Sequence, residues 1–458
     1  MKRILLSVFA AALTAAWAVP ATAASVDFSG QYRLRGEFRD NKDFDENNTD
    51  TNSDYLQRVR LTANAQATSD TSVKITIQDS RTWGTNVTTK GTPGVTSGPG
   101  LTDANNNTSL DLHESYVLVK DLFGSPISAK IGRQQLVYGD QRLIGAFGWD
   151  NRARSFDAIK FSYGSEMVNV DAWTSKVREN TTSDNDQDFY GLYATVKAVP
   201  NNTVDVYALY LRDGSTTAFV GNNTTSNAVF TGAGAINKPQ DLWTYGLRVK
   251  GNWNAVDYTG EIAGQTGTID KATASFDLSG TMVTIKGGYT LPLQAAKVRV
   301  GAEYDYASGD SNPGDNDMET FTNLFPTNHG HYGYADVQGL RNTSTWGINA
   351  KAQVNPQLSL YAAYWNFTLA EEHDNWYGAG DWMSNPTAGF RTGNATNTQD
   401  EAASEVDLVA TYKYNSAFTA QLGYSLVTTG DLTDSKIAGA GGQAADQDFA
   451  YLMLTANF

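Results

Sequence analysis

The chain has 458 residues, a formal net charge of −15 and no cysteine, so it must hold together without disulfides. Its mean hydropathy is −0.40, and beyond the first 24 residues no segment approaches the roughly 18 consecutive apolar residues of a transmembrane helix. These features exclude a helical membrane protein and a disulfide-rich domain, and we expect no nucleic-acid partner. They leave open a membrane β-barrel, whose strands place only alternate residues in lipid.

The first 23 residues have the features of a secretory signal peptide. Lys2 and Arg3 precede a mostly apolar stretch over 4–19, and small residues follow it. We expect cleavage after residue 23 or 24, because the stretch is short for a membrane anchor and no stop-transfer pattern follows. The remaining chain, 24–458, shows no linker or change in composition, which indicates a single domain.

Alternation of apolar and polar residues begins immediately after this segment. In 28–39 one face carries Phe28, Tyr32 and Phe38, whereas the opposite face carries Arg33 and Arg35. An Arg that faces lipid at mid-membrane costs about 2–4 kcal/mol, so the charged face must meet water. The alternative is a soluble β-sandwich, whose polar face meets solvent. The same two-residue period recurs in 55–67, 243–253, 297–306 and 405–414.

The connections between these strands distinguish the two folds. Short connections fall at 68–70, 121–126, 164–166, 199–202, 252–254, 292–295, 355–356 and 415–416. Long ones alternate with them at 40–54, 81–108, 138–155, 178–188, 213–240, 265–280, 308–342, 370–402 and 429–446. Short periplasmic turns and long extracellular loops are typical of outer-membrane barrels. We therefore predict an all-β, transmembrane antiparallel barrel of about 18 strands, with 16 as the alternative count, in the bacterial outer membrane.

The last strand supports this assignment. Residues Ala450, Leu452, Leu454, Ala456 and Phe458 lie on one face, and the chain ends on an aromatic side chain. This ending resembles the terminal signature of outer-membrane barrels. The resemblance implies insertion by the barrel-assembly machinery.

Basic residues gather on the polar faces of the first three strands. A strip of like charge in a confined passage attracts solutes of the opposite charge, and rings of Arg and Lys select anions. We therefore expect an electropositive path. The alternative is that these residues pair with carboxylates and brace the wall. The candidates are Arg33, Arg35, Arg39, Arg58, Arg60 and Lys74, with Arg248 and Arg299 on the polar faces of later strands.

The long loops are acidic in contrast. Clustered carboxylates could bind a divalent cation, which could bridge to lipopolysaccharide phosphates. The alternative is that these loops are acidic only for solubility. The weak metal candidates are Asp310, Asp315 and Asp317, and we expect no other cofactor.

Enzymatic function finds little support. His329 and His331 could offer two imidazoles to a metal beside Asp336, but a pair of this kind in a long loop is usually polar surface. Ser–His catalysis would need His113 or His373 beside a suitable serine. We therefore predict that the protein is not an enzyme.

Two stretches resemble the alginate-export family of outer-membrane barrels. They are GRQQLVYGDQRLIG at 132–145, followed by Trp149, Arg154, Phe156 and Asp157, and LFPTNHGHYGYAD at 324–336. The resemblance implies an eighteen-stranded monomer with a narrow, arginine-rich passage for an anionic polysaccharide such as alginate or for smaller organic anions. It nominates site residues Arg133, Asp140, Arg142, Arg154 and Asp157.

Arg133 conflicts with the predicted register. It shares the lipid-facing parity of Ile127 and Ile131, so either a bulge near Gly132 resets the strand or Arg133 lies above the bilayer. The region 138–155 is too charged and too rich in glycine for a simple loop, so we expect part of it to fold into the lumen. The predicted function is an outer-membrane channel or porin for diffusion or export of anionic solutes. The alternative is a non-transporting surface barrel whose loops bind a ligand or a surface polymer.

Overall fold

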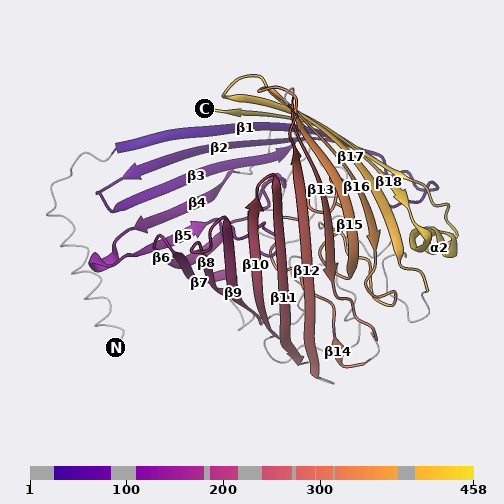
Figure 1. Cartoon of the computed structure of the whole chain (residues 1–458), viewed down its shortest axis with the longest axis horizontal. Coiled ribbons are helices and arrows are strands. Elements are labelled where there is room, and N and C mark those ends of the chain that lie inside the picture. Colours follow the sequence, from indigo (N-terminus) through magenta and orange to yellow (C-terminus); the bar gives the residue numbers. More distant parts are fainter. Residues whose placement is uncertain are drawn as a thin grey trace.

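The strands form one closed antiparallel barrel (Figure 1). The computed structural model describes residues 25–83, 110–179, 186–214, 240–270, 275–293, 296–312, 315–379 and 398–458. The predicted signal peptide, 1–23, lies outside the described residues. Within the described ranges, no helix combines the length and the apolar character needed to cross a bilayer.

Eighteen antiparallel strands make up the wall, which confirms the higher of the two predicted counts. A further strand, β14 (Asp317–Met318), is a two-residue parallel pairing with β12. The wall strands are β1 (Ser25–Asp40), β2 (Asn52–Gln66), β3 (Thr71–Thr82), β4 (Leu110–Val119), β5 (Ile127–Gln134), β6 (Phe156–Gly164), β7 (Val168–Arg178), β8 (Gln187–Val196), β9 (Asn202–Asp213), β10 (Gln240–Trp253), β11 (Val256–Asp270), β12 (Ser275–Leu291), β13 (Lys297–Ala307), β15 (Thr343–Gln353), β16 (Leu358–Thr368), β17 (Glu401–Lys413), β18 (Phe418–Thr429) and β19 (Gln447–Asn457).

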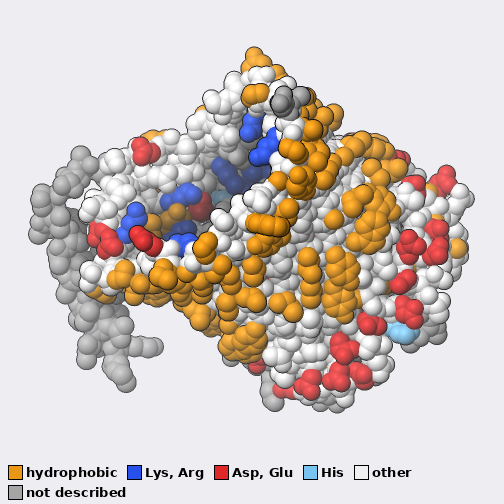
Figure 2. All heavy atoms as spheres, in the orientation of Figure 1, with side chains coloured by type: hydrophobic (Ala, Val, Ile, Leu, Met, Phe, Trp, Pro, Cys, Tyr) orange, Lys and Arg blue, Asp and Glu red, His pale blue; other side chains and the backbone are white. Residues whose placement is uncertain are grey.

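The two faces of the wall follow the predicted alternation. Phe28, Leu61 and Leu408 point outward, with 80%, 53% and 52% of their surface exposed, whereas Arg58 and Asp407 are buried inside. Figure 2 shows the outward apolar side chains as a band across the strands. It also shows Lys and Arg side chains inside the hollow bounded by the first strands, and acidic side chains at the opposite end of the molecule.

All eight predicted short connections fall between consecutive wall strands. The predicted long connection at 265–280 is shorter than expected, because β11 continues to Asp270 and β12 begins at Ser275. Alternation persists there in small and polar residues: Gln265 and Ile269 are buried, and Thr266 and Thr268 are exposed. Such residues are typical of loops, which explains the error.

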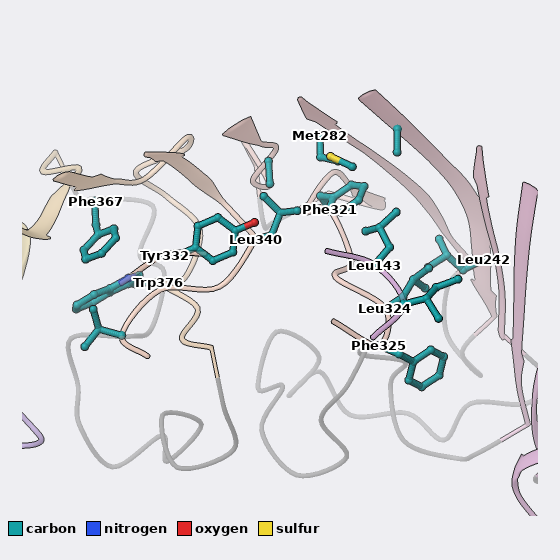
Figure 3. Close-up of a cluster of buried hydrophobic side chains, with 14 of the residues drawn as sticks. Leu143, Leu242, Met282, Phe321, Leu324, Phe325, Tyr332, Leu340, Phe367 and Trp376 are labelled. Carbon is teal, nitrogen blue, oxygen red and sulfur yellow. The ribbon is translucent and has the colours of Figure 1, made fainter. Parts of the chain in front are cut away.

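The core of the molecule lies inside the barrel. Residues from the β5–β6 and β13–β15 connections pack against the inner wall, and Figure 3 shows Leu143, Phe321, Leu324 and Phe325 among them. Further along the wall, Trp376 of the β16–β17 connection packs near Phe367 of β16. The prediction that part of 138–155 folds into the lumen is therefore confirmed. A short helix, α2 (Asp431–Gly439), packs against the end of β17.

Candidate functional site

Two connections meet inside the barrel, and we call them the first inner segment (135–155) and the second inner segment (319–341). A parallel β-bridge joins Ile144 to Phe325. The amide of Gly145 donates to the carbonyl of Phe325 at 2.8 Å, and the amide of Phe325 donates to the carbonyl of Leu143 at 2.8 Å. Arg154 donates to the carbonyls of Gly145 and Pro326, at 3.2 and 2.8 Å. The motif residue Arg154 therefore ties the two segments together.

The second inner segment is also fixed to the wall. Glu405 of β17 accepts hydrogen bonds from the amides of Tyr334 and Ala335, at 2.7 and 2.8 Å. Glu405 is fully buried, as is Asp407 two residues further along β17. These two carboxyl groups were not among the site residues predicted from the sequence, although the alternation of β17 places them on the lumen face.

Three of the predicted lumen arginines form a cluster beneath the first inner segment. Arg33 and Arg35 on β1 and Arg58 on β2 are 3–5% exposed. Their guanidinium groups donate mainly to the main-chain carbonyls of residues 148–150, at 2.5–3.2 Å. The guanidinium of Arg35 also lies 3.7 Å from the ring centroid of Trp149. The positions on the lumen face are as predicted, but the first inner segment covers them.

Basic residues continue along the lumen face over β2 to β6, where the first inner segment covers them less; we call the lumen face of β1 to β6 the basic wall. Arg60 donates to Gln78 at 2.7 Å, and Lys74 forms an ion pair with Glu114 at 2.6 Å. Lys130 and Lys160 face each other directly across β5 and β6 on the lumen side. Like charges in directly opposed positions destabilise a sheet, and here the carboxylate of Asp171 offsets the charge of Lys160. Neither lysine was among the lumen residues predicted from the sequence, although strand parity alone places both in the lumen.

Lys160 belongs to a group that includes an aromatic stack. Its ammonium lies 3.0 Å from a carboxylate oxygen of Asp171, which also accepts the hydroxyl of Tyr138 at 2.7 Å. The Tyr138 ring stacks on Trp173, with centroids 4.8 Å apart, and contacts Tyr193 at 4.6 Å. These rings attach the start of the first inner segment to β7 and β8. Below them lies a pocket of about 470 Å³, whose lining includes Ser128, Ser162, Asn169 and Thr195.

Asp140 and Arg142 anchor the middle of the first inner segment. Asp140 pairs with Arg248 of β10 and Lys286 of β12, and Arg248 also pairs with Asp205 of β9 at 2.9 Å. Arg142 is 2% exposed. It contacts Glu303, lies 3.1 Å from Asp305 on β13, and donates to the hydroxyl of Tyr332. The predicted residues Asp140, Arg142 and Arg248 therefore converge, but as an internally neutralised brace.

Arg133 and Asp157 do not line the passage, which corrects their prediction as site residues. The β5–β6 register has no shift, so the two residues pair directly and share the outward face of Ile131 and Ile159. Arg133 lies 3.2 Å from Asp157, whose side chain is 61% exposed. Gly132 adopts a positive φ, but the parity of the strand is kept. The pair lies at the end of the strands nearest the first inner segment.

Arg299 lies on the lumen face near the opposite end of the barrel, close to the turn between β12 and β13. It binds both carboxylate oxygens of Asp257, at 2.6 and 2.7 Å, and Asn349 at 3.2 Å. Its carboxylate partner favours the bracing interpretation at this position.

The weak metal candidates lie in the β13–β15 connection. The carboxylate of Asp310 accepts the amide of Asn312 at 3.1 Å, and Asp315 accepts the amide of Asp317 at 2.8 Å. Burial, followed by the neighbouring carboxylate of Asp374, raises the pKa of Asp310 to about 6. Among the described residues, which omit 313–314, no three acidic, His or Cys side chains are arranged to hold a metal ion.

The two histidines of the second inner segment have separate partners. His329 lies 3.0 Å from Asp336, and its ring stacks on Trp149 with centroids 3.7 Å apart. His331 contacts the carbonyl of Asp140 at 2.8 Å. Burial, followed by the nearby charge of Arg142, holds the pKa of His331 well below its usual value, so the ring is neutral. Both rings therefore pack the two inner segments together.

Comparisons with known proteins agree with this architecture. The sequence profile of the alginate export family matches residues 24–444. Among solved structures, Pseudomonas aeruginosa OpdO is similar, with a TM-score of 0.56, 11% sequence identity, and coverage of 95% of this chain and 97% of that one. P. aeruginosa OpdK with vanillate has a TM-score of 0.54, 10% identity, and coverage of 94% and 98%. P. aeruginosa OccK2 (OpdF) in complex with glucuronate has a TM-score of 0.54, 9% identity, and coverage of 95% and 98%. No curated protein matches the sequence.

Proposed function

Because this chain belongs to the alginate export family of outer-membrane barrels, we propose that it is a channel whose solutes are organic anions, with sugar carboxylates as the leading class. Family and fold are those of porin channels and not of enzymes. The observation that carries the preference for anions is the basic wall of β1 to β6. Its lysines and arginines outnumber the carboxylates that pair with them.

Two features of the wall support this preference. Lys130 lies 4.0 Å from the ring of Tyr116 and has no ion-pair partner among the described residues, whereas its directly opposed neighbour Lys160 pairs with Asp171. Arg60 has an amide, not a carboxylate, as its partner. Unneutralised charge in a confined, low-dielectric passage raises the local concentration of anions. The ligands named for two similar folds, glucuronate and vanillate, both carry a carboxylate, which makes them suitable first probes.

Ion selectivity in planar bilayers tests this proposal. The double variant Lys130→Gln/Lys160→Gln should shift the reversal potential toward cations and lower the anion-to-cation permeability ratio roughly tenfold, which corresponds to about 1.4 kcal/mol. The control is Lys413→Gln, which removes one positive charge at the exposed end of β17. Cation preference in the unmodified channel, or an equal shift in the control, would contradict the proposal.

A second candidate function is a surface barrel that does not transport. The observation that favours it is the filled interior, in which Arg33, Arg35 and Arg58 are 3–5% exposed beneath the first inner segment. Absence of conductance by the full chain in bilayers, at every potential and with every anion tested, would favour this candidate.

A further inference from the structure

The cluster of Arg33, Arg35 and Arg58 has an unusual set of partners. Arg33 and Arg58 are directly opposed across β1 and β2, a position in which like charges repel. Among the described residues, neither has a carboxylate within ion-pair distance, whereas Arg35 pairs with Glu37 at 2.5 Å. A buried guanidinium without a counter-ion is costly. The cluster therefore retains a strong capacity to bind an anion.

Neutral main-chain oxygens occupy the place where such an anion would bind. Arg33 donates to the carbonyls of Gly148, Trp149 and Asp150, at 2.8, 3.0 and 3.2 Å. Arg58 donates to the carbonyls of Gly148 and Asp150, at 3.0 and 3.2 Å. Hydrogen bonds from a guanidinium to a carboxylate or phosphate are stronger than bonds to a neutral carbonyl. An anionic oxygen would therefore compete effectively for these donors.

The arginine donors are also incompletely used. The Nε atoms of Arg33 and Arg58 and one terminal nitrogen of Arg60 are buried without a hydrogen-bond partner among the described residues. A buried donor that is left unpaired costs about 1–3 kcal/mol. The carbonyls accept bonds from the two terminal nitrogens of Arg33 and from one terminal nitrogen of Arg58, but not from either Nε. A carboxylate can accept bonds from Nε and a terminal nitrogen of one guanidinium together.

The covering segment, residues 148–152, is bounded by two strained positions. Phe147 has φ 48° and Ala153 has φ 61°, both in the left-handed region that is unfavourable for residues other than glycine. Such conformations cost about 1–3 kcal/mol each and persist only where the surroundings impose them. Release of the segment would remove this cost at both ends, so the two residues are suited to act as hinges.

Hydrogen bonds from β3 and from the second inner segment help to hold the segment closed. Ser80 and Gln78 donate to the carbonyls of Asn151 and Arg152, at 2.7 and 2.8 Å, and the amide of Phe147 donates to Thr327 at 2.9 Å. The Trp149 ring lies between the His329 ring and the guanidinium of Arg35, with centroid separations of 3.7 Å on each side. The Asn151 amide donates to the carbonyls of Gln57 and Arg81, at 3.0 and 3.2 Å. These bonds attach the segment to the edge of the passage and not to its own neighbours in sequence.

We propose that residues 148–152 form a displaceable cap, in which three main-chain carbonyls hold the arginine cluster until a sugar carboxylate takes their place. The inference rests on the proposed function, because the same arginines bind the main-chain carbonyls in the closed state and the anionic solute in the conducting state. The anion replaces the carbonyls at Arg33 and Arg58, and the segment then turns about Phe147 and Ala153. Opening is thereby coupled to the arrival of an anionic solute.

Hydrogen exchange on the full chain in lipid nanodiscs tests the cap directly. Sodium glucuronate should accelerate amide exchange in 147–153, whereas glucose, which has a similar ring without the carboxylate, should leave it unchanged. In planar bilayers, glucuronate should also raise the conductance measured in chloride. Unchanged or slower exchange in 147–153 while glucuronate permeates or binds would overturn the cap.

A matched pair of variants separates the cap from the channel. Asn151→Ala removes the two bonds to Gln57 and Arg81 and the bond at 3.3 Å that its side-chain oxygen accepts from Arg33, so exchange in 147–153 and basal conductance should rise roughly tenfold without glucuronate. Asn64→Ala removes a lumen-facing asparagine of β2 outside the cap and should change neither. Anion preference with no response to glucuronate or to Asn151→Ala overturns the cap alone. Absence of anion preference overturns the proposed function itself.

Discussion

At the scale of single residues, Arg142 shows how a buried charge organises the interior. It is 2% exposed and lies against the carboxyl groups of Glu303, which is partly buried, and Asp305, which is fully buried, on β13. The pairing holds the first inner segment against the wall. Removal of one partner from a buried ion pair leaves the other charge uncompensated, which is more costly than the pair is stabilising.

Arg142→Met should therefore destabilise the barrel by about 3–5 kcal/mol, because two carboxyl groups lose their cation while the side-chain volume is kept. The measurement is the free energy of unfolding by urea in lipid vesicles. The control is Arg299→Met, whose pair with Asp257 is partly exposed and should contribute about 1 kcal/mol or less. An equal decrease in the free energy of unfolding of the two variants would show that burial does not make the Arg142 ion pairs more important to stability than the Arg299 ion pair.

The residues nominated by family resemblance divide into two groups. Asp140, Arg142 and Arg154 do converge inside the barrel, whereas Arg133 and Asp157 pair on its outer face. Strand parity placed Arg133 on the lipid-facing side, whereas the family resemblance placed it in the passage. The structure agrees with strand parity. Parity is a local property of extended backbone and is therefore readable from sequence.

At the scale of elements, the close pairing of β5 with β4 depends on one glycine. Gly132 has φ 122°, and a Cβ atom there would lie 2.3 Å from the carbonyl oxygen of Ser115 on β4. Only glycine adopts this conformation without strain and also allows β4 to approach so closely. The first inner segment begins directly after this strand, so its position depends on β5.

Gly132→Ala should lower the unfolding free energy by more than about 2 kcal/mol, because it combines a steric overlap with a strained backbone. The folded fraction after refolding into detergent, read by electrophoretic mobility, provides the measurement. Gly260→Ala on β11 is the matched control, since the nearest atom to its Cβ would be 4.0 Å away. A control that folds as poorly as Gly132→Ala would indicate a general sensitivity of the strands.

At the scale of the whole molecule, the last residue extends the pairing between β1 and β19 that closes the barrel. Phe458 and Gly30 exchange two main-chain hydrogen bonds, at 2.6 and 3.0 Å. The Phe458 ring occupies the space beside Gly30, where a Cβ would lie 2.4 Å from its atoms. β1 and β19 thus form the seam at which the barrel becomes a ring.

Deletion of residue 458 should lower the unfolding free energy by about 1–3 kcal/mol, since the two main-chain bonds between Phe458 and Gly30 are lost. Phe458→Ala keeps the main-chain bonds and should have a smaller effect. Refolding into lipid vesicles, where no assembly machinery is present, measures both. An alanine variant as unstable as the deletion would show that the ring, and not the main chain, closes the seam.

Sequence alone predicted the barrel, a count of about eighteen strands with sixteen as the alternative, the positions of its eight short turns and the basic residues on the lumen face of its first three strands. Each follows from alternation and turn chemistry, which act between residues close in the chain. Only the tertiary structure decided that residues 148–152 cover Arg33 and Arg58, and that Arg142 reaches β13. These contacts join residues about 90 or more positions apart in the sequence, and no local pattern encodes which side chains meet once a segment folds inward.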